Sequence, residues 1–268
     1  MVPGLLIIFL LAAAVPSWGG GGQARQFCIS CHFVHYAERG RCVDCHLGNA
    51  ASERKNIAHA GLREGKYARF TIGDRVRMKA GQHLLDLLAC RRCHTSAGLG
   101  NRLAVNLDRS AGSKTAGEVA LSIERPVMNM PDFGLDEGKI TALVNIILSN
   151  AQGRETAETV PVRVHFSDSG KNSVDLFSKN CGSCHRMLSE RLGAVGTGTI
   201  GPNLSGLLSK YYPRTFKDDE AWTAAKLASW LKNPRRIKLW ARMQPVMLTA
   251  AEMKELESII SVSAVPGS

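Results

Sequence analysis

The feature that most constrains this chain is a five-residue pattern, Cys-x-x-Cys-His, which occurs four times in 268 residues. The copies begin at Cys28, Cys42, Cys90 and Cys181. With eight cysteines and eight histidines in the chain, chance would produce on the order of 0.01 copies. The four copies use every cysteine, namely Cys28, Cys31, Cys42, Cys45, Cys90, Cys93, Cys181 and Cys184. The fold must therefore present four such turns, two of them within 19 residues.

This spacing is typical of covalent haem attachment. One helical turn places both sulfurs at one porphyrin edge, where they add across the two vinyl groups, and the adjacent imidazole reaches the iron. The alternatives are disulfides, zinc sites and a thioredoxin-type cysteine pair. Zinc sites usually combine two cysteine pairs around one tetrahedral ion. A thioredoxin-type pair needs only one motif, in a βαβ setting. We predict four covalently attached haem c groups, each holding one iron.

On these motifs the chain resembles a tetrahaem c-type cytochrome. Residues 76–265 resemble two tandem class I (mitochondrial-type) cytochrome c domains, in which a helix leads into the motif and a methionine loop precedes a closing helix. The resemblance implies an all-α fold with these two modules behind a small dihaem segment organised by its haems. The expected divisions are a signal peptide at 1–19, a bis-His dihaem segment at 20–72, and class I modules at 73–152 and 153–268.

Apolar periodicity and capping residues predict the helices of these modules. Ser52 is expected to cap a short helix in the dihaem segment. Thr249, with Glu252 three residues later, predicts a capping box at the start of the last helix. The expected helices run from Val76 toward Cys90, over 118–123 and 136–149, from 174 toward Cys181, from Ala221 to Asn233, and over 250–262.

Each haem iron needs axial ligands, and the histidines of the motifs supply one each: His32, His46, His94 and His185. The class I resemblance implies a methionine as the sixth ligand, commonly followed by proline. Met130 and Met243 fit this position, with Met128 and Met247 as their alternatives. A ligating imidazole also needs its other N–H held by a carbonyl. The resemblance places Pro202 in that role in the last module, and the matching loop places Val105 there in the middle module.

His35 and His59 are the natural sixth ligands of the first two haems. His35 follows His32 by three residues, on the same face of that haem, so it cannot easily reach the opposite face of the same iron. We therefore expect His35 to serve the haem on Cys42 and Cys45, and His59 to serve the haem on Cys28 and Cys31. The swapped assignment stays open, and His83 is a spare histidine that could replace His59.

The beginning of the chain predicts export. An apolar run over 5–15 precedes Ser17 and Gly19, the small residues that a signal peptidase needs, and is short for a membrane span. No Lys or Arg precedes the run, so a retained anchor is the alternative, and only then is membrane contact expected. Haem attachment to this motif takes place outside the cytoplasm, which agrees with a periplasmic protein.

The formal net charge is +11, and eight haem propionates would reduce it to roughly +3 to +7. No basic motif interleaved with aromatic residues occurs, so nucleic acid is not an expected partner. The remaining basic surface suits an acidic redox partner.

With six ligands on every iron, no position stays open for a substrate, so we expect no catalytic residues and no enzyme activity. The expected function is one-electron transfer, with low-potential bis-His haems and higher-potential Met-ligated haems. Residues 42–70 look like multihaem cytochromes of metal- and selenite/tellurite-reducing bacteria. Expected partners are redox proteins, with a membrane quinol-oxidising complex and other multihaem cytochromes as candidates. The alternatives are a cytochrome subunit of an oxidoreductase or respiratory complex, and a subunit of a larger haem-conducting assembly.

Overall fold

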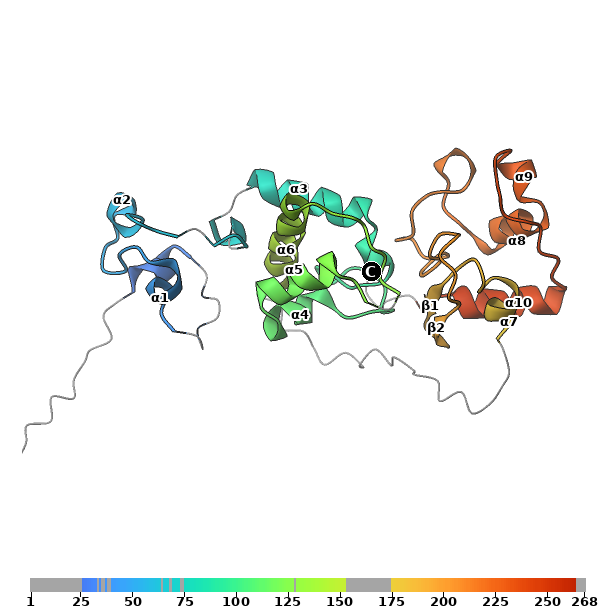
Figure 1. Ribbon diagram of the computed structural model, residues 1–268, viewed down its shortest axis with the longest axis horizontal. Coiled ribbons are helices and arrows are strands. Elements are labelled where there is room, and N and C mark those ends of the chain that lie inside the picture. The colour runs from blue at the N-terminus through green and yellow to red at the C-terminus, as the bar shows by residue number, and fades with distance from the viewer. Residues whose placement is uncertain are drawn as a thin grey trace, which may run out of the picture. The chain divides into compact units, whose positions relative to one another are not determined.

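The computed structural model describes residues 26–32, 34, 37, 40–63, 65–67, 69–72, 75–127, 129–152 and 175–263. His35, Met128 and the predicted export segment lie outside these residues. The chain divides into two compact units, 1–64 and 65–268. Residues 65–72 fall in the second unit, whereas the sequence analysis placed them with the dihaem segment. The described elements are helices and one two-stranded sheet (Figure 1). The assignment to class I cytochrome c modules stays a prediction.

In the first unit, the described residues form very short helices, and no apolar core is found among these residues. They are the 3₁₀ helix η1 (Phe27–Ser30), α1 (Cys42–His46) and α2 (Lys55–Ala58), and none of them contains a buried residue. The predicted Ser52 cap is wrong, because α2 begins one residue after Arg54 and Ser52 Oγ accepts the Arg54 amide in a separate turn. Backbone hydrogen bonds from Phe27 to Ala50 and from Arg63 to His46 connect the helices.

The first part of the second unit is a helical cluster around α6. Its elements are η3 (Arg69–Ile72), α3 (Arg75–Leu87), η4 (Cys90–Arg92), α4 (Leu107–Ser113), α5 (Ala116–Glu124) and α6 (Glu137–Ala151). Helix α6 begins at the Asp136 cap, whose side chain accepts the Lys139 amide, and it contacts α3, α4 and α5 (Figure 1). Its apolar face, which includes Leu143, Val144 and Ile147, is buried in the core. The helices predicted over 76–90, 118–123 and 136–149 are confirmed, and α4 is an additional one.

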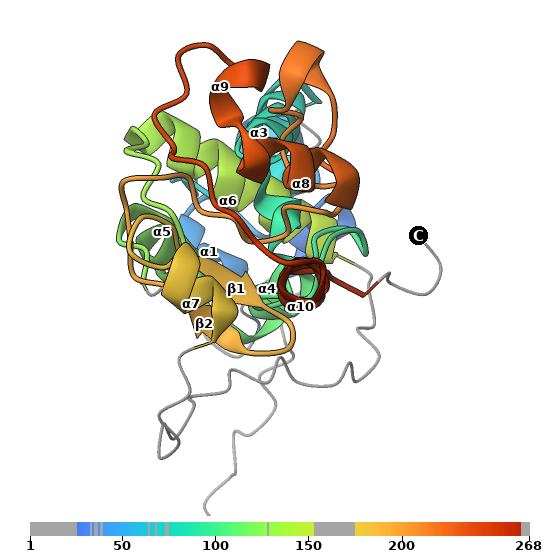
Figure 2. The same ribbon diagram turned by 90° about the vertical axis from the view of Figure 1, so that its right-hand side faces the viewer.

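The described residues of the second part form the sheet, four further α-helices and one 3₁₀ helix. Strands β1 (Met187–Ser189) and β2 (Gly193–Val195) pair antiparallel, with Met187 opposite Val195. The helices are α7 (Leu176–Asn180), η5 (Lys217–Asp219), α8 (Ala224–Lys232), α9 (Pro234–Ile237) and α10 (Ala250–Ile260). Helices α7 and α10 lie side by side (Figures 1 and 2). The predicted capping box at Thr249 and Glu252 is confirmed.

Two separate apolar cores stabilise the second unit. The first contains Leu85, Val119 and Leu143 among other buried residues, and the second contains Phe177, Leu227 and Ile259 among others. Each core lies directly under one Cys-x-x-Cys-His motif, since Cys90 packs against the first and Cys181 belongs to the second. The cores therefore position the two motifs of this unit.

Candidate haem-binding sites

All four motifs form the helical turn that their spacing predicts. The second motif is the helix α1 itself. In the other three, the histidine amide donates to the carbonyl of the first cysteine, at 2.9 Å for His32, 3.0 Å for His94 and 2.9 Å for His185. The two cysteines and the histidine of each motif therefore share one helical turn, which is the backbone conformation expected for covalent attachment to a porphyrin.

The cysteines of the described motifs are all free thiols. Burial raises the pKa of Cys90 to about 11 and the pKa of Cys181 to about 11. Reactive cysteines in redox enzymes have a lowered pKa and are partly ionised at neutral pH. The thiols of Cys90 and Cys181 are instead held neutral, so their surroundings do not favour a thioredoxin-type function.

Three motif histidines are oriented by backbone carbonyl groups. His46 Nδ1 lies 3.0 Å from the Arg63 oxygen, His94 Nδ1 lies 2.8 Å from the Val105 oxygen, and His185 Nδ1 lies 2.9 Å from the Pro202 oxygen. A carbonyl only accepts, so Nδ1 must donate, which leaves Nε2 with its lone pair for a metal. The hydrogen bonds predicted to the Val105 and Pro202 carbonyls are therefore both present, and the bond to the Arg63 carbonyl was not predicted.

In the first unit, the imidazole rings of His32 and His59 lie near each other. Their centroids are 6.0 Å apart and the ring planes are inclined by 39°. A metal–nitrogen bond is about 2.0 Å long, and the ring centre lies about 1 Å beyond the nitrogen, so two imidazoles on opposite sides of one iron have centroids about 6 Å apart. This spacing supports the assignment of His59 to the haem on Cys28 and Cys31.

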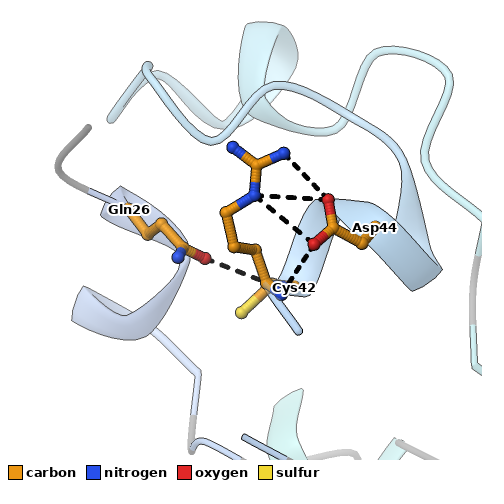
Figure 3. A network of polar contacts seen from close by, with 4 residues as sticks. Gln26, Cys42 and Asp44 are labelled. Atoms are coloured by element: carbon orange, nitrogen blue, oxygen red, sulfur yellow. Dashed lines mark hydrogen bonds and ion pairs between the residues drawn. The ribbon is translucent and has the colours of Figure 1, made fainter. Parts of the chain in front are cut away.

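The two motifs of the first unit are also joined to each other. The Gln26 side chain, just before η1, accepts the Cys42 amide at 3.3 Å (Figure 3). Arg41 and Asp44 form a capping box around the start of α1, with an ion pair of 2.9 Å. Burial raises the pKa of the Cys28 thiol, and the neighbouring Cys42 thiol raises it further. The first cysteines of the two motifs therefore lie near each other.

In the middle module, the predicted ligands line one cavity. It is partly open to solvent and has Cys90, His94 and Met130 among its lining residues. The rest of the lining is mostly apolar: Leu88, Val105, Leu107, Val119, Ile123, Phe133, Leu143 and Ile147, with Lys114 and Ser122. A mostly apolar lining with a few polar groups is typical of sites that bind organic ligands and cofactors. Burial also lowers the pKa of His94, which keeps its imidazole in the neutral, metal-binding form.

In the last module, the glycine next to the proximal histidine is required for close approach. A Cβ atom on Gly201 would lie 2.2 Å from His185 Cε1 and 2.5 Å from Nδ1, well inside any allowed contact. His185 is itself buried. The backbone of Gly201 thus lies directly against the imidazole that the Pro202 carbonyl orients.

The methionines of the last module differ in their surroundings. Trp230 Nε1 donates to Met243 Sδ at 3.1 Å, and Met243 packs against the core. Met247 is 77% exposed and Met187 is fully buried in the core. Met243 is therefore partly buried, unlike exposed Met247 and fully buried Met187, and its role as a ligand stays a prediction. The structure brings Met130 and His94 to one cavity, whereas the contact that it shows for the Met243 sulfur is the one with Trp230.

The described part of the chain contains no cluster of three or more His, Cys, Asp or Glu side chains with metal-binding geometry. An iron held by one histidine and one methionine, or by two histidines, would not form such a cluster. None of the described helices is both long and apolar enough to cross a bilayer. No family model, curated protein or solved structure matches this chain.

Proposed function

We propose that this protein carries single electrons between protein partners outside the cytoplasm, through four covalently attached c-type haems. The observation that carries the proposal is the middle-module cavity, where the motif thiol of Cys90, the oriented imidazole of His94 and the thioether of Met130 meet in an apolar setting. These side chains could hold a haem, with Cys90 forming a thioether bond and His94 and Met130 binding the iron. When bound, the haem supplies an iron that cycles between Fe(II) and Fe(III).

The remaining roles belong to side chains and backbone. The cysteine pairs would hold each porphyrin by two thioether bonds, and the carbonyls of Arg63, Val105 and Pro202 fix the imidazole tautomer and orientation. The apolar lining of the cavity would limit the contact of a bound haem with water, and a less solvated Met-ligated haem has a higher potential. In the first unit, His32 and His59 would hold one iron from both sides. The two class I modules and the bis-His segment form part of the same proposal.

A carrier rather than an enzyme follows from the ligand sets, because an iron with both axial positions filled offers no place for a substrate. The test is carbon monoxide binding by the native, fully reduced protein, combined with electron paramagnetic resonance of the oxidised form. We expect no carbon monoxide complex at neutral pH and only low-spin signals. One full high-spin equivalent that binds carbon monoxide would contradict the carrier function and favour an oxidoreductase.

An observation in the last module favours a second candidate, a subunit of a larger haem-containing assembly. Leu239 and Trp240 are adjacent and remain 84% and 79% exposed. Exposed apolar groups of this size are typical of protein interfaces, where tryptophan is enriched. Native mass measurement of the protein purified without denaturant tests this: a complex that dissociates on Trp240→Ser favours the assembly, and a monomer favours a freely diffusing carrier.

A further inference from the structure

The loop after the predicted proximal histidine of the last module contacts the predicted methionine loop of the middle module. Asn203 Nδ2 donates to the Asn129 carbonyl at 2.8 Å. Asn129 immediately precedes Met130. On its other side, Asn203 follows Pro202, whose carbonyl accepts from His185 Nδ1 at 2.9 Å. Asn203 is thus adjacent in sequence to Pro202, which orients the predicted ligand His185, and it binds Asn129, which is adjacent in sequence to the predicted ligand Met130.

The side chain of Asn203 is held in place for this contact. Its Oδ1 accepts from the Ser205 amide at 2.9 Å and from the Ser205 hydroxyl at 2.6 Å, and Ser205 is fully buried. With Oδ1 committed to this turn, the amide nitrogen is directed to the Asn129 carbonyl. An amide is needed here because it both accepts and donates.

The motif of the middle module contacts the same loop. Arg92, inside the third Cys-x-x-Cys-His motif, donates from Nη1 to the Asn203 carbonyl at 3.1 Å, and the Tyr212 hydroxyl donates to this carbonyl at 3.2 Å. The Arg92 guanidinium lies 5.5 Å from the centre of the Tyr212 ring.

A second contact lies beside the first. The side chain of Asn101 is buried, and its Nδ2 donates to the Arg92 carbonyl at 2.9 Å and to Ser209 Oγ at 2.8 Å. The backbone also approaches closely, since a Cβ atom on Gly206 would lie 2.5 Å from the Arg92 oxygen. The contact is therefore a set of directional hydrogen bonds that fix one relative position of the two loops.

We propose that Asn203 is a positioning residue that couples the two haem sites of the second unit into one redox unit. This inference rests on the proposed function. The link runs from Met130 through the Asn129 carbonyl to the Asn203 amide, and from the Pro202 carbonyl to His185. With both haems bound, this link would hold the two sites in one relative position for the exchange of a single electron, in which one iron would be oxidised and the other reduced with no bond formed or broken.

The test compares the holoprotein with an Asn203→Asp variant. Aspartate keeps the oxygen that accepts from Ser205 but replaces the donating nitrogen with a second oxygen, which repels the Asn129 carbonyl. Asn150→Asp is the matched control, because Asn150 donates its amide to Ser96 at 3.1 Å within the middle module. Pulse reduction measures the rate at which an electron equilibrates between the two Met-ligated haems, and a redox titration corrects for the added charge.

We expect Asn203→Asp to slow this equilibration several-fold and to separate the unfolding of the two modules into two transitions, with Asn150→Asp unchanged in both. Should Asn203→Asp lose haem, Arg92→Met, which removes the Arg92 bond to the Asn203 carbonyl, is measured in its place with the same expectation. Four haems per chain with unchanged rates and a single transition would overturn this inference alone. Wild-type protein without haem would overturn the proposed function, and this inference with it.

Discussion

Replacing Gly201 by alanine adds a single carbon atom beside His185 and thereby tests the predicted role of this histidine as an iron ligand. The new Cβ would lie 2.2 Å from Cε1, 2.5 Å from Nδ1 and 2.8 Å from Nε2 of the imidazole. To reach an ordinary contact of 3.4 Å, ring and backbone must separate by about 1.2 Å. The backbone has little freedom to retreat, because the Gly201 amide donates to the Cys184 carbonyl at 2.8 Å and the Pro202 carbonyl holds the ring.

A displacement of that size would lengthen the bond between His185 and Pro202 beyond hydrogen-bonding distance, and it would move Nε2 away from an iron. Overpacking of this kind costs about 1–3 kcal/mol, and the lost hydrogen bond adds about 1 kcal/mol. We therefore expect the Gly201→Ala holoprotein to unfold at lower denaturant concentration, with one haem in four changed from low-spin to high-spin or lowered in potential.

The assays are denaturant unfolding and electron paramagnetic resonance of the oxidised protein. Gly117→Ala is the matched control: Gly117 lies in α5, and the nearest atom to its added Cβ is Thr115 Oγ1 at 4.0 Å. That change should leave all four haems unaltered and raise stability by up to about 1 kcal/mol. If Gly201→Ala keeps four low-spin haems at wild-type potentials, the assignment of His185 as an iron ligand is refuted.

Three further predictions concern the other ligands and the last helix. Met130→Ala should abolish one of two equivalents of sulfur–iron absorption, while Met128→Ala retains both; the opposite result would exchange their roles. His59→Ala should convert one low-spin bis-His haem to a form that binds carbon monoxide, and His83→Ala should not; an effect of His83→Ala alone would show that it replaces His59. Hydrogen bonds from Thr249, the N-cap residue of α10, hold the pKa of Glu252 below its usual range. The contribution of the Glu252 carboxylate to the folding free energy is therefore complete above about pH 4.3 and is lost as the pH falls through the pKa of the folded state. Glu252→Gln should remove this part of the acid dependence of unfolding, and an unchanged dependence would contradict the prediction.

Helices were predictable where local side chains mark their ends. Asp136 and Thr249 accept the first free amides of α6 and α10, and both residues stand just before an apolar periodic run. The helix predicted from Ala221 begins at Ala224 instead, because Thr223 accepts the Lys226 amide and sets the start. This signal, a threonine next to the helix, was present in the sequence.

Other elements depend on contacts that a sequence pattern does not contain. Helix α4 includes Gly and Ser, and its start is held by buried Asp108, which accepts the amides of Ala97 and Gly98. Strands β1 and β2 have three residues each, too few for an alternating pattern to be recognised.

The same distinction holds for the candidate sites. The motif turns and the carbonyl partners of His94 and His185 were predictable, because each partner lies within 17 residues of its histidine. The bond from Asn203 to Asn129 spans 74 residues, so only the folded chain brings these groups together. The pair His32 and His59 is intermediate: the sequence predicts both histidines as ligands of one iron, but the distance between their rings is known only from the structure.

The central claim is that four haems are covalently attached, one to each motif. Intact mass spectrometry of the protein produced in a host that exports and matures c-type cytochromes tests it most directly, together with the haem-to-protein ratio from reduced alkaline pyridine spectra. The account predicts four haems per chain in the wild type and three when Cys42 and Cys45 are both replaced by alanine. A chain of unmodified mass that carries zinc, or disulfides within the motifs, would contradict it.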